Sequence, residues 1–222
     1  MVTQLREEIF NGRRLPGSDL RELTIARDLN VSQATVREAH YRLEHAGLVT
    51  RKPHVGTTVT RLSPKDLRER VALRAILECL AAEAAAPRMS EADFEELDRR
   101  LKVLSAGIET DNYYETAQAD LDFHRYIWKC SGNETLCLLL ELVTVPLFAF
   151  ISIMRSHGLQ RLTTVVASHT PLVAALRSRD SGQIRGAFEK GATSSYESFL
   201  GEQSELTLAE AFGFLQFGRG QA

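Results

Sequence analysis

Residues 31–40, VSQATVREAH, place small polar side chains ahead of an arginine in a helical rhythm. Val36, Ala39 and Leu43 follow one another at spacings of three and four residues, which predicts a helix with one buried side. Arg37 lies off that side. The segment is therefore predicted to pack on one face and to offer hydrogen-bonding groups on the other.

The flanking segments predict two more helices. Residues 2–10 have apolar residues at helical spacing and end near Asn11-Gly12, a common helix stop. A Pro-Gly turn follows, and then a second helix whose apolar set is Leu20, Leu23, Ala26 and Leu29. Asn30 is expected to form the tight turn into the third helix, which Ser32 caps. Two helices joined by a short turn, the second with a polar outer face, form a helix-turn-helix.

The pattern changes in LVTRKPHVGTTVTRL, residues 48–62, where short β-formers surround a turn that contains Pro53 and Gly56. Such a pattern predicts a two-stranded hairpin, which is a wing beside the helix-turn-helix. Residues 1–62 are therefore predicted to form a winged helix-turn-helix DNA-binding domain.

From residue 63 onward the β signals fade, and the sequence predicts an all-α helical bundle over residues 63–222. Pro87, Gly107, Gly132-Asn133, Gly158 and Gly182 mark the helix breaks. Between these breaks helices are expected over 64–86, 90–108, 112–131, 134–157, 168–179 and 181–200. The fold class is mainly α.

Charge is distributed unevenly along a chain whose net charge is −2. Residues 1–62 carry ten Lys and Arg against seven Asp and Glu, a net of +3, and the remainder carries seventeen against twenty-two, a net of −5. Only the N-terminal part is therefore a candidate for binding a polyanion such as DNA.

The sequence favours a cytoplasmic protein without a membrane partner. Its three cysteines have no C-x-x-C spacing and suggest neither a disulfide framework nor a zinc knuckle, and we see no signal peptide. The run over residues 136–154 is nearly apolar for about the length of a membrane span, but it contains Glu141, Thr144, Pro146 and Ser152. We interpret it as the buried central helix of the bundle.

The order of these parts, together with LPGSDLRELTIARDLNVSQATVREAHYRLEHAGLVTRKPHVGTTV, resembles the GntR family of bacterial transcription factors. The second half, with RAILECLAAEAA, DLDFHRYIWKCSGNETL and SHTPLVAALRSRD, is similar to the FCD effector-binding domain of the FadR-like branch. The resemblance implies a homodimeric repressor or activator that binds a palindromic double-stranded DNA operator and responds to a small organic acid, a carboxylate effector, in the helical domain.

The chain departs from the usual family pattern V-S-R-T-P-V-R-E-A-L at three positions. Gln33 stands where the first arginine is usual, Thr35 replaces the proline and His40 replaces the leucine. Glutamine suits adenine whereas arginine suits guanine, so the operator sequence is expected to differ from the family's commoner sites.

Candidate DNA contacts lie on the third helix and on the wing. Gln33, Thr35 and Arg37 are expected to face the bases, because the N-terminal part of a recognition helix enters the major groove. For Arg37 the alternative is a surface ion pair near Glu38 or Tyr41. Further candidates for phosphate or minor-groove contacts, each of which is equally compatible with solvated surface charge, are Arg6, Arg51, Lys52 and His54.

Asp120 and His124 are four residues apart and share one face of a predicted helix with Ala117 and Leu121. Both are therefore expected to be buried, where they need partners. His169 also lies among apolar residues. We place it in the first turn of a helix, where the helix dipole keeps its ring neutral.

In FCD domains that this chain resembles, the metal ligands are this Asp, this His, a counterpart of His169 and a further His, whose place here falls near Gly191. The three remaining ligands are compatible with a divalent metal such as Zn or Ni, with positions left open for an effector carboxylate. The alternative is a hydrogen-bonded Asp–His pair that lines a pocket without metal.

Candidate effector-binding residues surround this cluster. Arg74 precedes Glu78 by four residues, so it either forms a local ion pair or turns inward to bind a carboxylate. Arg155 is a second candidate, and Ser194 or Ser195 would fill the space of the missing histidine.

The leading hypothesis is a ligand-responsive DNA-binding regulator that is not an enzyme. A metal-dependent hydrolase that uses Asp120, His124 and His169 is the alternative, although no general base is evident beside that trio. A protein-interaction adaptor is a third class.

Overall fold

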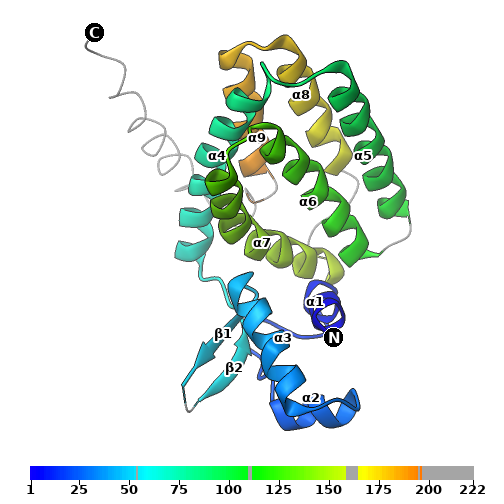
Figure 1. The fold of residues 1–222 in the computed structure, drawn as a ribbon, viewed down its shortest axis with the longest axis vertical. Coiled ribbons are helices and arrows are strands. Elements are labelled where there is room, and N and C mark those ends of the chain that lie inside the picture. The colour runs from blue at the N-terminus through cyan, green and yellow to red at the C-terminus, as the bar shows by residue number, and fades with distance from the viewer. Residues whose placement is uncertain (54, 110–111, 159–164, 195, 197–222) are drawn as a thin grey trace, which may run out of the picture.

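The computed structural model describes residues 1–53, 55–109, 112–158, 165–194 and 196. Three helices and a hairpin form an N-terminal unit, which packs below a bundle of longer helices (Figure 1). The mainly α fold class predicted from the sequence is confirmed.

The N-terminal unit consists of α1 (Val2–Phe10), α2 (Glu22–Asp28), α3 (Gln33–His45), β1 (Val49–Lys52) and β2 (Gly56–Val59). The two strands are antiparallel, with Val49 opposite Val59. Residues 17–20 run beside β2, where the Leu20 amide donates to the Thr57 carbonyl at 2.8 Å. The arrangement is a winged helix-turn-helix, as the sequence predicted.

Local signals place α3 as expected. Asn30 adopts a φ of 51°, a left-handed conformation that asparagine tolerates, and so makes the turn between α2 and α3. The Ser32 hydroxyl then accepts a hydrogen bond from the Thr35 amide at 3.1 Å, which caps the helix. Val36 and Ala39 on the opposite face are buried.

One core residue of α2 was predicted wrongly. Leu23 is 70% exposed, whereas Ile25 and Ala26 are buried. The helix has only seven residues and begins at Glu22, so the inward direction of Ile25 and Ala26 turns Leu23 toward solvent.

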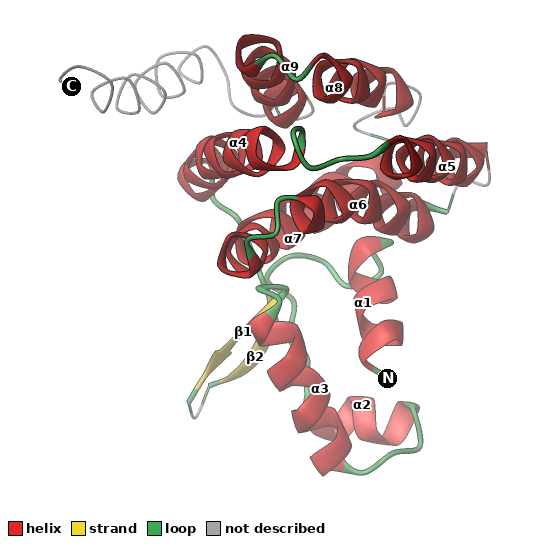
Figure 2. Cartoon of the chain, turned by 45° about the horizontal axis from the view of Figure 1, so that its top comes forward, coloured by secondary structure: helices red, strands yellow, loops and turns green. Residues whose placement is uncertain are grey.

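The second unit is a bundle of α4 (Pro64–Ala85), α5 (Glu91–Glu109), α6 (Tyr113–Cys130), α7 (Glu134–Ser156), α8 (Val165–Ser178) and α9 (Ser181–Ser194). Ser63 and Asp66 form a capping box before α4, and Asn133 caps α7. Figure 2 shows the helices in rows: α6 and α7 lie nearest the N-terminal unit, α4 and α5 lie above them, and α8 and α9 are farthest away.

The start of α8 corrects an expectation about His169. The helix begins at Val165, four residues before His169, and continues through Pro171. His169 is therefore in the second turn and not in the first. The helix-dipole argument for its neutral ring consequently does not apply.

The central helix α7 is long and apolar enough to span a membrane, yet 61% of its most apolar stretch is buried inside the structure. Pro146 lies within it and has no amide hydrogen to donate to the Leu142 carbonyl. Arg70 on α4 supplies the replacement, because its Nη1 donates to that carbonyl at 3.1 Å. The Leu142 carbonyl of α7, which has no backbone donor at Pro146, thus forms a contact with α4.

The two units share one hydrophobic core. Leu5 and Phe10 of the N-terminal unit belong to the same buried cluster as Leu140 and Phe148 of α7. At Gly47, whose φ is +69°, an added Cβ would lie 2.8 Å from the Pro146 ring. This close approach of backbone to α7 sets the position of the winged helix on the bundle.

A buried histidine in α3 generates a prediction about stability. His40 is fully buried, both of its ring nitrogens lack a hydrogen-bond partner among the described residues, and burial lowers its pKa. We expect His40→Leu to raise the free energy of unfolding by about 1–3 kcal/mol, because an unsatisfied buried polar group is replaced by an apolar one.

The same substitution is expected to change the pH dependence. Because the pKa of His40 is lowered in the folded chain, the unfolded chain binds a proton at this histidine more readily. The free energy of unfolding therefore decreases as pH falls below about 6.5. This decrease should be smaller in His40→Leu. Urea unfolding at pH 7.5 and pH 5.5 measures both effects. Equal stability of the two proteins at both values would contradict the prediction.

Candidate functional site

The exposed face of α3 carries Gln33, Thr35 and Arg37, as the sequence suggested. Thr35 Oγ1 lies 2.8 Å from Ser32 Oγ, so this hydroxyl is held at the start of the helix. Arg37 Nη2 lies 3.4 Å from Gln33 Oε1. The three side chains thus form one polar surface on the first two turns of α3.

Arg37 forms an ion pair, but with a partner that the sequence did not indicate. Its Nε lies 2.7 Å from Glu22 Oε2 on α2, whereas Glu38 pairs with Arg42. Glu22 is fifteen residues away, so helical spacing gave no signal for this contact. The ion pair is made by Nε, whereas an arginine binds a guanine edge through two of its guanidinium nitrogens.

The wing carries two of the other candidates. Arg51 and Lys52 are exposed on β1, and Arg51 Nη1 lies 3.2 Å from Glu44 Oε2 at the end of α3. The remaining wing candidate, His54, lies outside the described residues.

Arg6 lies elsewhere than expected. Its guanidinium packs against the Phe10 ring, and burial together with the nearby Arg125 of α6 lowers its pKa. The side chain therefore faces the junction with the helical bundle. This position argues against the proposed contact of Arg6 with DNA.

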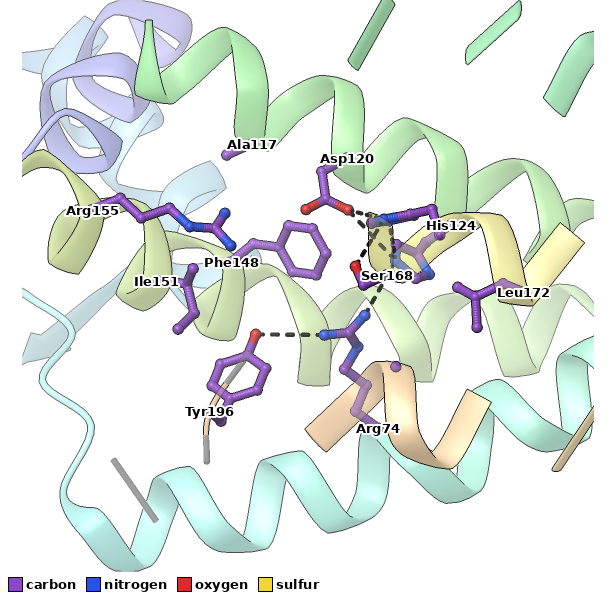
Figure 3. Close-up of a pocket in the computed structure, with 12 residues that line it drawn as sticks. Arg74, Ala117, Asp120, His124, Phe148, Ile151, Arg155, Ser168, Leu172 and Tyr196 are labelled. Carbon is purple, nitrogen blue, oxygen red and sulfur yellow. Dashed lines mark hydrogen bonds and ion pairs between the residues drawn. The ribbon is translucent and has the colours of Figure 1, made fainter. Parts of the chain in front are cut away.

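In the bundle, Asp120, His124 and His169 converge from α6 and α8 (Figure 3 labels the first two). His169 Nε2 lies 2.8 Å from Asp120 Oδ1 and 3.2 Å from His124 Nε2, and the third side of this triangle, His124 Nε2 to Asp120 Oδ1, is 3.5 Å. All three side chains are buried. The sequence prediction that they meet in one buried site is borne out by this geometry.

Glu78 on α4 holds the second ring nitrogen of His124. The Glu78 Oε1 atom lies 2.9 Å from His124 Nδ1, which leaves Nε2 directed toward Asp120 and His169. Burial by itself would raise the pKa of Glu78, but Arg74 and His124 lower it to about 2. Burial is also the main cause that lowers the pKa of His124, so the ring is neutral at pH 7.

Arg74 combines the two roles that its sequence position left open. It is buried and pairs with Glu78 at 3.3 Å, and it also points inward (Figure 3). Its Nη2 lies 3.3 Å from His124 Nε2, and its guanidinium covers the Phe148 ring at 4.9 Å. A cation therefore stands at the centre of the site.

Arg155 and Tyr196 close the other end of this cavity. Arg155 is 5% exposed, burial lowers its pKa, and its Nε has no hydrogen-bond partner among the described residues. The Tyr196 hydroxyl lies 3.5 Å from Arg74 Nη1, and burial raises its pKa to about 12. The remaining space is about 20 Å³, enough for one ion or water molecule.

The residues expected to replace the missing histidine are not the ones that line the cavity. Gly191 and Tyr196 line it, Ser194 does not, and Ser195 lies outside the described residues. Tyr196 lies two residues beyond the end of α9, its amide donates to the Thr193 carbonyl at 2.8 Å, and its side chain lines the cavity. Helical periodicity gave no signal for this residue.

The donor set fits a divalent metal. Ligand atoms in a tetrahedral zinc site are about 3.4 Å apart for bond lengths near 2.1 Å, and the three distances of 2.8, 3.2 and 3.5 Å are close to that value. Glu78 on the outer nitrogen of His124 is the partner that metal-bound histidines usually have. Asp120 Oδ1, His124 Nε2 and His169 Nε2 are thus the three atoms that would hold the ion.

A winged helix-turn-helix is a DNA-binding fold, and here it is joined to a helical domain with a buried polar cavity, which indicates a DNA-binding protein of two parts. Comparison with known families agrees. The model of the gntR family of bacterial regulatory proteins matches residues 1–59, and that of the FCD domain matches residues 69–190. The chain belongs to the GntR family, and it is a regulator with an FCD domain.

Relatives match most of the length of the chain. The chain is 32% identical to a probable D-xylose utilization operon transcriptional repressor from Paenarthrobacter nicotinovorans, with 81% of this chain and 80% of that one covered. It is 25% identical to the HTH-type transcriptional repressor RspR of Escherichia coli, with 82% and 80% covered. The solved structure of E. coli McbR/YncC has the same fold, with a TM-score of 0.71, 21% identity and 96% of each chain covered.

These relatives decide between the function classes. The family and the names of the relatives indicate a transcriptional regulator. They give no support to the hydrolase alternative.

The geometry of α3 yields a prediction about DNA. Arg37→Ala should weaken binding to duplexes that the wild-type protein selects from a random library by about 1–3 kcal/mol and reduce discrimination between them, because a base-edge contact is lost. Competition binding at two salt concentrations measures affinity and salt slope. Arg42→Ala, another exposed arginine of α3, is the control. If Arg37→Ala leaves both quantities unchanged, the assigned role is wrong.

Proposed function

We propose that this protein is a cytoplasmic homodimeric repressor whose affinity for operator DNA is set by a small organic acid. Residues 1–62 bind DNA, and residues 63–222 bind the effector and dimerise. The observation that carries the proposal is the convergence of Asp120, His124 and His169 with two buried arginines in one cavity. Such a group of buried charges is costly unless a ligand or partner uses it.

The two arginines indicate the effector's chemistry. Arg74 and Arg155 approach the cavity from different helices, and the planar guanidinium binds a carboxylate through two parallel hydrogen bonds. Because only about 20 Å³ is free, Arg74 has to leave His124 when an acid enters. Its guanidinium then pairs with the effector carboxylate, while Arg155 Nε gains a partner.

Asp120, His124 and His169 are proposed to hold a divalent ion such as zinc or nickel. A bound ion supplies a positive charge and open coordination positions for an effector oxygen. Burial favours the neutral form of His124, and the Glu78 carboxylate beside Nδ1 favours the tautomer with its proton on Nδ1, so Nε2 is free to bind the ion. Glu78 fixes the orientation of the ring.

Regulation follows from population shift. An effector changes DNA affinity only if it binds one orientation of the winged helices better than another. α7 contributes Phe148 and Arg155 to the cavity, and it also packs against the winged helix at Gly47. A movement of α7 on effector binding therefore changes how the DNA-binding units are held. Two of the relatives are named repressors, which supports repression as the direction of control.

The dimer is proposed to form through α4 and α7. These neighbouring helices carry exposed apolar side chains that the monomer leaves in solvent, namely Leu73, Leu80, Leu138, Leu139 and Leu142. Exposed apolar side chains on two packed helices favour an interaction site there, and a two-fold dimer places two recognition helices about one turn of DNA apart.

Leu138→Glu combined with Leu142→Lys should convert the dimer to a monomer at micromolar concentration, because charged groups would be buried in the interface. Sedimentation velocity measures the change. Val103→Glu introduces a charge at an equally exposed apolar position on α5 and should leave the dimer intact. A wild-type protein that sediments as a monomer would refute the assembly.

Nickel titration followed by calorimetry tests the metal site. The wild-type protein should bind one ion per chain. His169→Gln should weaken binding at least about a hundredfold, because removal of one of three protein ligands leaves two. His157→Gln, a change at an exposed histidine outside the cavity, is the matched control. Equal affinity in both variants would show that the ion binds elsewhere.

A panel of acetate, lactate, malonate and gluconate, tested with and without nickel, examines the acid site. At least one acid should raise the thermal unfolding temperature, and Arg155→Met should abolish that rise. Arg185→Met, at a partly exposed arginine that pairs with Glu83, should retain it. Stabilisation that persists in Arg155→Met would place the acid outside this cavity.

A further inference from the structure

A second cavity lies between the winged helix and the bundle. Its volume is about 420 Å³, compared with about 20 Å³ for the cavity around Asp120. The winged helix contributes Ile9, Leu48 and Val59, and α7 contributes Ala149, Ile153 and Met154. The segment 60–62, which links the two units, also lines the cavity, as do Leu15 and Pro16.

The lining of this junction cavity is almost entirely apolar. Thr60 and Arg61 are the polar side chains among the described residues that line it, and none of these residues is acidic. Arg61 is exposed and has no ion-pair partner in the part of the chain that the structure describes. An apolar cavity that has the unpaired guanidinium of Arg61 at its edge is complementary to an apolar molecule that carries one negative charge.

We propose that the junction cavity is a second ligand site, which binds a small amphipathic anion with an aromatic or aliphatic body and a single carboxylate. The volume falls within the range of about 300–1,000 Å³ that is usual for small-molecule sites. The body fills the space between Leu48 and Ile153, and the carboxylate pairs with Arg61.

This position couples the second site to the first through α7. Pro146, Ala149 and Ile153 of this helix face the junction cavity, whereas Phe148, Ile151 and Arg155 face the buried polar cavity. A ligand in the junction contacts both units at once and stabilises the relative orientation seen here. Control of DNA binding by this ligand rests on the proposed function, whereas binding of the ligand in the junction cavity does not.

The test uses full-length protein labelled with ¹³C at its methionine methyl groups and 2-naphthoate as the probe. The chain has three methionines, and they report on different places. Met154 lines the junction cavity, whereas Met89 is buried in a separate cluster that includes Phe94 and Leu97. Naphthoate should shift the Met154 signal in a saturable manner and leave that of Met89 unchanged.

Two substitutions separate the apolar and charged contributions. Ala149→Phe fills the cavity and should abolish the Met154 shift. Arg61→Gln, at an exposed position that does not endanger folding, should weaken naphthoate at least fivefold. The same change should leave the neutral analogue 2-naphthalenemethanol unaffected. Arg68→Gln removes a nearby arginine that does not line the cavity and should change neither affinity.

The outcomes also distinguish this site from the buried polar one. Binding that survives Ala149→Phe but is lost in Arg155→Met would assign the probe to the polar cavity and overturn the proposal. So would the absence of a Met154 shift at millimolar naphthoate, or an Arg61→Gln protein with unaltered affinity. Because these readouts need no DNA, a failure of the regulatory function would leave them interpretable.

Discussion

The packing of the winged helix on α7 is the constraint on which the remaining structure depends. Gly47 approaches Pro146 so closely that no side chain fits between them, and the buried cluster runs from Leu5 through Leu140 without a boundary between units. α7 is therefore a core helix for the DNA-binding unit and for the bundle at the same time. Its apolar character, which alone would suit a membrane, follows from being covered on more than one side.

The polar cavity imposes a second constraint, because six acidic and basic side chains are buried there together, namely Arg74, Glu78, Asp120, His124, Arg155 and His169. Glu78 is placed between Arg74 and His124, and Asp120 lies against His169, so each carboxylate has a charged or hydrogen-bonding neighbour. Removal of one of these charged side chains would leave its partner buried without a counter-charge. The resulting loss of stability would exceed the stability that the intact pair contributes. In the proposed function, a carboxylate effector would replace one of these pairings with a pairing of its own.

Sequence reasoning succeeded where the determinant was local. The cap at Ser32, the left-handed Asn30 and the shared face of Asp120 and His124 depend on spacings of a few residues, and all of them appear in the structure. It failed where a contact depended on how a short helix is rotated about its axis, or on residues far apart in the sequence. Leu23 was misplaced by the phase of a seven-residue helix. The partner of Arg37 was fifteen residues away and therefore gave no periodic signal.

The packing around Gly191 explains why a fourth histidine does not fit there without a change. An added Cβ at Gly191 would lie 3.1 Å from Leu172 Cδ2, so a histidine there would force Leu172 to shift. The guanidinium of Arg74 lies beside the cluster, with Nη2 3.3 Å from His124 Nε2. In the proposed function, the lack of a fourth histidine would weaken the binding of a metal ion. The buried arginine would instead give an anionic effector a direct partner.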